Sequence, residues 1–171
     1  TVPGFYDDVD ETPAEILDEW KSLGFSEGEF LGAVGLKLPA GEKGRSVLEM
    51  TWARPTCEIN GMIGGYTGDG FKTVIPGIAS AKVSMRLVGR MDPDRIRAAF
   101  RAHVRALVPE DCEVTFAEHG ASPAILIPAD NAIVAAGRAA LADEWGKPPV
   151  RTGSGGSIPV VGWFKTELGM D

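Results

Sequence analysis

Between positions 54 and 120, the pattern of hydrophobic and polar residues predicts two strands, a helix and a further strand. The segments "RPTCEINGMIGG" and "TVIPGIASAKVSMRLVG" have the short apolar–polar alternation of strands, and the second is interrupted at Pro76-Gly77. Apolar residues at helical spacing then follow an Asp92-Pro93 helix start. The segment "CEVTFAEHG" predicts the last strand. This order is typical of an α+β fold in which an antiparallel sheet has helices on one face.

The same alternation sorts side chains between the two faces of the predicted sheet. Every second residue of the second strand is expected to face the helices, which leaves Arg86 on the open face. In the last strand, the alternation leaves His119 on that open face, if the strand stays regular. A guanidinium and an imidazole on one face could together present cationic donors to a carboxylate. The positions expected to face the helices are Val83, Met85, Leu87, Cys112, Val114 and Phe116.

Helical patterns lie on both sides of this region. The segment "DDVDETPAEILDEWKSLG" predicts a helix with Thr12 as its N-cap and Glu15 completing a capping box. Another helix is expected to start near Ser46, and "NAIVAAGRAALADEWG" predicts a helix capped by Asp130 or Asn131. The final apolar run, "IPVVGWF", is expected to enter a strand or a strand pair.

Composition limits the class of protein. A chain of 171 residues fits one domain, or one domain with a fragment of another. Hydrophobic residues make up 44% and charged residues 24%, which is enough apolar material for a packed core. The net charge of -7 argues against nucleic acid or an anionic membrane as a partner. No apolar run approaches the roughly 18 residues of a membrane helix, and the first residues lack a signal-peptide pattern.

Two cysteines and two histidines limit redox and metal chemistry. Cys57 and Cys112 lie far apart, and one bridge is not the pattern of a secreted scaffold. Two buried, reduced thiols in a cytosolic protein are therefore favoured over a disulfide. His103 and His119 do not occur in any H-x-x-E-H or H-E-x-x-H spacing, so the chain shows no complete transition-metal site of its own.

Two glycine-rich segments are candidates for anion binding. In "GYTGDGFKT", Phe71 precedes Lys72-Thr73, so the phosphate-loop pattern is missed and a hairpin turn is the better explanation. The segment "RTGSGGSIPVV" fits a flexible connector. It fits equally well a site whose bare N–H groups and Ser157 bind the anionic end of a ligand. The residues alone leave both interpretations open.

Five motifs in order resemble one family of enzymes. They are PTCEING (55–61), KTVIP (72–76), SMRLV (84–88), HG (119–120) and GGSIP (155–159). Each motif is weak alone, but the five together cover nearly the whole chain. They resemble the co-catalytic zinc metallopeptidases, which include carnosinase-like dipeptidases, succinyl-diaminopimelate desuccinylase and aminoacylase. The resemblance is strongest to the dipeptidase branch.

The resemblance implies an architecture. In this family, a catalytic domain holds two zinc ions, and an inserted lid domain dimerises and reaches over the active site. The lid is a two-layer α+β sandwich of the ferredoxin-like type. By resemblance, residues 1–122 are expected to form the lid, and residues 123–171 to begin the C-terminal part of the catalytic α/β domain. The family's metal-binding motifs have no counterpart here, so the zinc ligands are expected to lie outside this chain, which would then be an internal fragment.

The resemblance also assigns roles to individual residues. Arg86 corresponds to an arginine that binds the substrate carboxylate. His119 corresponds to a histidine that contacts the substrate and helps to stabilise the tetrahedral oxyanion. Thr73 corresponds to a threonine supplied to the substrate pocket across the dimer. Gly156 and Ser157 correspond to the loop that holds the C-terminal end of the substrate.

A function follows as an expectation from this resemblance. The parent protein would be a cytoplasmic, homodimeric, zinc-dependent dipeptidase, in which metal-bound hydroxide attacks the amide of a dipeptide or an N-acyl amino acid. This chain alone is expected to be inactive. Two alternatives come from other classes of protein: a non-catalytic dimerisation module, and an amino-acid-binding domain that needs no metal.

Overall fold

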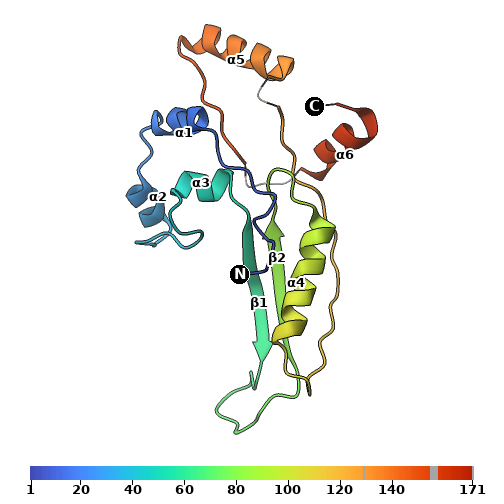
Figure 1. Cartoon of the computed structure of the whole chain (residues 1–171). Coiled ribbons are helices and arrows are strands. Elements are labelled where there is room, and N and C mark those ends of the chain that lie inside the picture. Colours follow the sequence, from blue (N-terminus) through green and yellow to red (C-terminus); the bar gives the residue numbers. More distant parts are fainter. Residues whose placement is uncertain (129, 155–157, 171) are drawn as a thin grey trace.

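The computed structural model describes residues 1–128, 130–154 and 158–170 and shows the predicted α+β class (Figure 1). A two-stranded antiparallel sheet is preceded by three helices and followed by three more in this part of the chain. The elements are α1 (Ala14–Lys21), α2 (Glu27–Ala33), α3 (Val47–Trp52), β1 (Thr56–Gly64), β2 (Ala79–Arg86), α4 (Pro93–Leu107), α5 (Ala132–Trp145) and α6 (Pro159–Leu168).

The sheet formed by β1 and β2 contains a bulge at Asn60. Ile59 pairs with Val83, and the next paired residue of β1 is Gly61, so Asn60 is the extra residue. A bulge shifts the alternation of side chains by one position. As a result, Ile59 and Met62 lie on the same face of the sheet, although they are three residues apart.

The long helix α4 lies against β2, as the helical pattern predicts (Figure 1). Asp92 caps the helix, because its carboxylate accepts hydrogen bonds from the amides of the two residues after Pro93. Met91 and Ile96 are buried together with Phe5, and Met85 of β2 packs against this cluster. Burial of these side chains therefore joins the N-terminal segment, the sheet and α4.

Helices α1 to α3 gather at one end of the sheet (Figure 1). The predicted cap at Thr12 is wrong, because Pro13 has the extended backbone of the cap residue and α1 has no side-chain cap. The capping box belongs instead to Ser46 and Glu49, at the start of α3, where a helix was expected. Trp20 of α1 is among the buried residues of this region.

The predicted strand at 112–120 is wrong, because none of these residues pairs with the sheet, and Phe116 and Glu118 contact α4 instead. Phe116 packs against Phe100 of α4, with ring centroids 6.4 Å apart. Arg101 lies 5.5 Å from the Phe116 ring centroid and also binds Glu118. An alternating pattern indicates only that one side of an extended segment is covered. Here helix side chains, and not a neighbouring strand, cover that side.

The predicted final strand is also wrong, because "PVVGWF" begins α6. Pro159 occupies the first helical position, where a missing N–H costs nothing, and Gly169 ends the helix in a left-handed conformation (φ 63°). A short apolar run cannot be assigned to helix or strand by its periodicity alone. The helix α5 agrees with its prediction, and Asn131 is its cap.

Two further observations concern membranes and thiols. Among the described residues, no helix combines the length and the apolar character needed to cross a bilayer. Cys57 and Cys112 are free thiols, and both are exposed, which corrects the expectation that they are buried.

Candidate functional site

Arg86 lies at the end of β2 on the face that points away from α4. Its partner across the sheet is Thr56. Val83 and Met85 are half-buried, whereas Ser84 and Arg86 are exposed, so the alternation predicted for this strand is confirmed. Arg86 therefore lies on the open face of the sheet, as the alternation predicts.

His119 is exposed, but it does not belong to a regular strand. The neighbouring Glu118 binds Arg101 and lies 3.7 Å from Arg97, so these contacts hold the segment to α4. Strand alternation, which was the reason to expect His119 beside Arg86, does not apply to a segment without strand geometry. A shared pocket for these two residues therefore remains a prediction.

Thr73 is exposed in the loop that joins β1 to β2. Gly65 and Gly70 have positive φ angles of 86° and 75°, which accounts for glycine in the turns of this loop. Lys72 lies 5.7 Å from the centroid of the Tyr66 ring, so the base of the loop is held by a cation–π contact. The loop extends beyond the end of the sheet (Figure 1).

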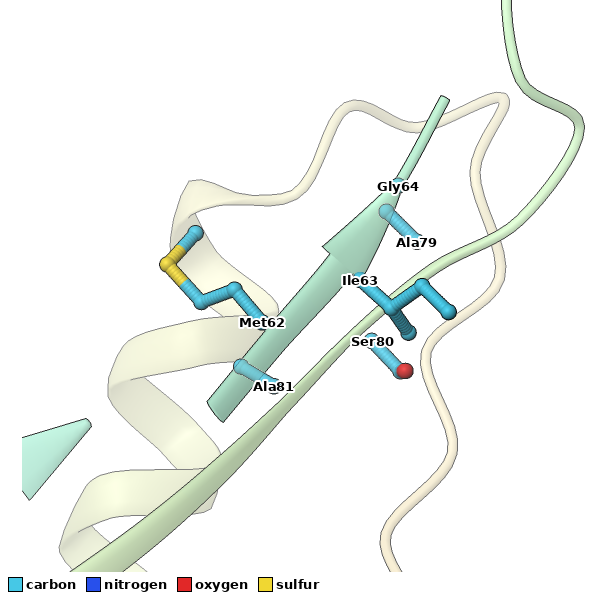
Figure 2. A pocket seen from close by; sticks show the side chains of 6 residues that line it. All are labelled: Met62, Ile63, Gly64, Ala79, Ser80 and Ala81. Atoms are coloured by element: carbon cyan, nitrogen blue, oxygen red, sulfur yellow. The ribbon is translucent and has the colours of Figure 1, made fainter. Parts of the chain in front are cut away.

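A shallow depression of about 430 Å³ lies at the tip of the sheet (Figure 2). Figure 2 shows that Met62 and Ile63 point to opposite sides of β1, with Ser80 on the side of Ile63. None of the described residues that line this depression is charged, and Lys82 lines the hollow next to it. Its lining residues are Met62, Ile63, Gly64, Ala79, Ser80 and Ala81.

Arg151, two residues before Gly153, is hydrogen-bonded to α1. Its amide and Nε donate to the two oxygens of Glu19 at 2.9 and 3.0 Å, and its Nη2 donates to Glu19 Oε1 at 2.6 Å. Its carbonyl accepts a hydrogen bond of 2.7 Å from Nε1 of Trp20. The hydrogen bonds from Arg151 lower the pKa of Glu19 to about 2, so this carboxylate is charged at neutral pH.

Gly153 passes very close to α3. A Cβ atom at this position would lie 2.3 Å from the carbonyl oxygen of Trp52, so only glycine fits. The ring of Trp52 packs edge to face with that of Trp20, with centroids 5.1 Å apart. The close approach suggested by the glycines thus occurs at Gly153, with Trp52 as the neighbour. Gly156 and Ser157 lie outside the described residues.

A buried ion pair that the sequence did not indicate lies just before β1. The side chain of Arg54 is 5% exposed, and its Nε and Nη2 donate to both oxygens of Glu42 at 2.6 and 2.8 Å. These hydrogen bonds lower the pKa of Glu42. Arg45 similarly holds Glu11 through two hydrogen bonds of 2.6 Å. No motif joins such residues, because their separations in sequence match no element period.

The described residues do not fit a metal centre on their own. Within residues 1–128, 130–154 and 158–170, no three or more His, Cys, Asp or Glu side chains are grouped so that they could hold a metal ion. The carboxylates of Glu19 and Glu42 are instead occupied by arginines.

Comparison with known proteins gives this chain a family. Residues 11–112 match the family model of the peptidase dimerisation domain of M20 peptidases. Over 175 residues, the chain is 28% identical to the Cys-Gly metallodipeptidase DUG1 of Candida albicans, covering 99% of this chain and 36% of that protein. Over 168 residues, it is 26% identical to the human Beta-Ala-His dipeptidase, covering 96% of this chain and 33% of that protein. The chain thus spans about a third of the length of these relatives.

Solved structures show the same relationship. The M20 family metallo-carboxypeptidase Sso-CP2 of Sulfolobus solfataricus superposes with a TM-score of 0.79 at 28% identity, covering 98% of this chain and 38% of that one. The dipeptidase Dug1p of Saccharomyces cerevisiae superposes with a TM-score of 0.71 at 26% identity, covering 99% of this chain and 36% of that one. The family model covers more than half of the chain, and the motif resemblance is confirmed, so this chain belongs to the M20 peptidase dimerisation domain family.

Proposed function

We propose that this chain is the lid, dimerisation and substrate-recognition part of a metal-dependent peptidase that hydrolyses dipeptides or N-acyl amino acids. The observation that carries the proposal is the family match over residues 11–112, extended by similarity to a metallodipeptidase along 99% of the chain. In this proposal, residues 1–122 form the lid, and residues 123–171 begin the C-terminal part of the catalytic domain. The enzyme works in the cytoplasm with two zinc ions, which residues outside this chain hold.

The chain's own residues recognise substrate and stabilise charge. Arg86 binds the carboxylate of the substrate from the open face of the sheet, and its exposure there supports this role. His119 donates a hydrogen bond to the oxyanion that develops at the amide carbonyl. Thr73 reaches the substrate pocket of the second protomer. Gly156 and Ser157 hold the C-terminal end of the substrate.

Arg86→Ala tests the recognition of the carboxylate in the enzyme that contains this chain. Turnover of a dipeptide is compared with turnover of the same dipeptide carrying a C-terminal amide. One lost charge-assisted hydrogen bond should lower kcat/KM for the free dipeptide by about ten- to a hundredfold. The amide, which lacks the carboxylate, should be hydrolysed equally by variant and wild type.

Two controls make this test specific. Lys82→Ala removes another cation from the same strand and should leave the preference for the free carboxylate unchanged. The isolated chain, assayed with and without added zinc, should not exceed the buffer rate. Equal losses on both substrates would show that Arg86 does not recognise the carboxylate, and no turnover of any dipeptide by the wild-type enzyme would refute the proposed activity.

The second part of the proposal is a homodimer formed through the end of the sheet. Large apolar side chains there are highly exposed, with Met62 at 76%, Ile75 at 94% and Phe71 at 108% of full exposure. Such a concentration of exposed apolar residues is typical of an association surface. A second copy of the chain is the partner we propose, because the matching family is a peptidase dimerisation domain.

The dimer is tested by sedimentation of the chain over a range of concentrations. Ile75→Asp places a charge in the proposed interface and should convert dimer to monomer. Leu38→Asp is the matched control, because Leu38 is also 78% exposed but belongs to the segment between α2 and α3, outside the proposed interface. A wild-type chain that stays monomeric at every concentration, or a Leu38→Asp variant that dissociates equally, would contradict this interface.

A further inference from the structure

The bulge in β1 places an asparagine where the pairing of the sheet is irregular, directly before a glycine. Ile59 pairs with Val83 and Gly61 pairs with Lys82, so Asn60 is the extra residue between two paired positions. A bulge disrupts the hydrogen-bond ladder locally and bends its strand. Asn60 is also exposed. Its side-chain amide and the backbone nitrogen of Gly61 therefore lie next to each other at the irregularity in the register of β1.

The glycine at position 61 leaves the backbone nitrogen after Asn60 accessible. This nitrogen can attack the side-chain carbonyl carbon, Cγ, of the preceding asparagine, and a Cβ atom on residue 61 would hinder its approach. Gly61 has no Cβ atom, and its backbone is the least restricted of any residue. Among the described residues, no hydrogen bond holds the side chain of Asn60 in place. Neither a side chain at position 61 nor such a bond therefore keeps the two reacting atoms apart.

The other asparagine of the chain is held away from the same reaction. The side-chain oxygen of Asn131 accepts hydrogen bonds from the amides of Ile133 and Val134 at 2.9 and 3.1 Å, as the cap of α5. The residue after it is Ala132, whose Cβ hinders an attack by its nitrogen. The sequence has only these two asparagines and no glutamine. Asn131 is therefore an internal comparison for Asn60.

We propose that Asn60–Gly61 is a site of spontaneous deamidation, and that its products alter the end of the sheet. The Gly61 nitrogen forms a bond to Cγ of Asn60, and the bond from Cγ to the side-chain nitrogen breaks. The proton of the Gly61 amide leaves with that nitrogen as ammonia, which gives a cyclic imide. Water then opens the imide at Cγ to give aspartate, or at the main-chain carbonyl to give isoaspartate. Water is the only co-reactant, and no oxidation or reduction takes place.

Both products change the strand beyond the bulge. Each introduces a negative charge, and isoaspartate also adds one carbon to the main chain. The register of a strand decides which side chains face which side of its sheet, so the added carbon disturbs the placing of Met62 and Ile63. These side chains are 76% and 60% exposed at the end of the sheet, where the dimer is proposed to form. The effect on the dimer rests on the proposed function, whereas the chemical step does not.

Peptide mapping by mass spectrometry follows the chemical step while the folded chain is incubated in mildly alkaline buffer. The peptide that contains Asn60 should gain the mass that separates a carboxylic acid from its amide, and the peptide that contains Asn131 should not. Gly61→Ala should slow this gain about tenfold, which corresponds to a barrier higher by about 1.4 kcal/mol. The added methyl group would meet only Cδ of Lys82, at 3.8 Å, so this variant should keep the fold.

The outcomes of the mapping are distinct. Equal rates in wild type and Gly61→Ala, or a gain at Asn131 as fast as that at Asn60, would overturn the proposed site. The comparison of the two asparagines needs no variant, so it decides the question if Gly61→Ala does not fold. Isomerisation at the exposed Asp69-Gly70 pair changes no mass and is not confused with deamidation. An isoaspartate-specific carboxyl methyltransferase then measures how much of the product at position 60 is isoaspartate.

Sedimentation of the incubated chain tests the effect on the end of the sheet. The wild type should lose dimer in proportion to the fraction converted at Asn60, while Gly61→Ala treated in the same way should retain it. Full conversion with an undiminished dimer would overturn the second part of the proposal. If the fresh chain never dimerises, the proposed dimer fails and the effect on it fails too. The mass gain at Asn60 distinguishes that failure, because it is read without any dimer.

Discussion

The indole N–H of Trp20 donates a hydrogen bond of 2.7 Å to the backbone carbonyl of Arg151, across 131 positions of sequence. This bond joins the first helix to the segment that precedes the glycine run. The ring of Trp20 is also buried and packs against Trp52. One side chain thus links α1, α3 and the distal part of the chain, and several consequences of this link can be measured.

Trp20→Phe keeps an aromatic ring but removes the hydrogen bond to Arg151. Because a partly buried carbonyl then loses its donor, we expect the free energy of unfolding to fall by about 1–3 kcal/mol in urea titrations. The control is Trp145→Phe, since Trp145 is 70% exposed at the end of α5 and should change stability by less than about 0.5 kcal/mol. Equal losses in the two variants would show that the bond to Arg151 contributes nothing.

Gly153→Ala should destabilise the chain, because the new methyl group would meet the carbonyl oxygen of Trp52 at 2.3 Å. Backbone atoms cannot move aside as a flexible side chain can, so we expect a loss of about 1–3 kcal/mol.

The contrasting substitution is Gly137→Ala, within α5, where the added methyl group meets nothing within 4 Å. Alanine favours helix over glycine by up to about 1 kcal/mol, so this variant should be stabilised. Thermal unfolding of both variants compares the two effects directly, and a neutral Gly153→Ala would contradict the close approach to Trp52.

Glu42→Gln should be among the most damaging single changes, because it removes the anion that accepts two hydrogen bonds from the buried guanidinium of Arg54. Breaking one side of a buried pair costs about 3–5 kcal/mol. Asp18→Asn is the comparison, since the Asp18–Lys21 pair has side chains that are 71% and 76% exposed. That variant should lose less than about 1 kcal/mol. Chemical denaturation of the two variants would contradict the prediction if their midpoints coincided.

Acid should weaken the attachment of Arg151 within a defined range of pH. The pKa of Glu19 is lowered from 4.5 to about 2 by the hydrogen bonds from Arg151, so the unfolded chain binds a proton before the folded chain does. The stability that this carboxylate contributes is therefore complete above pH 4.5 and is lost as the pH falls towards 2.

Urea midpoints measured between pH 2 and pH 6 test this dependence. Glu19→Gln should have a flatter profile than wild type across the range, whereas Glu144→Gln, at an exposed position of α5, should retain the wild-type slope. Identical slopes for wild type and Glu19→Gln would show that the carboxylate does not gain its interactions on folding.

Local patterns predicted a large part of this fold correctly. The Asp92-Pro93 start of α4 and the alternation of β2 were predicted, and Asn131, which caps α5, was one of the two residues expected there. Each depends on backbone geometry and side-chain bonds within a few residues, which is information that a short window contains. The five ordered motifs also predicted the family, which the match over residues 11–112 confirms.

Local patterns did not predict correctly where two of the segments pack. The alternating segment at 112–120 was predicted to join the sheet, but Phe116 packs on Phe100 of α4. The apolar run after Ile158 was predicted to be a strand, but it forms α6. In both cases the pattern identified which residues pack against other apolar residues. It did not identify which residues they pack against.

By itself, the sequence determined the starts of α3, α4 and α5, the two paired strands, the acidic charge and the family of this protein. The tertiary structure alone decided that Glu19 binds Arg151, that Arg54 is buried against Glu42 and that Gly153 lies on Trp52. The reason is physical: helix and strand periods repeat over a few residues, whereas these contacts join residues whose proximity depends on the packing of the chain as a whole. Only the complete set of buried surfaces determines which charges meet.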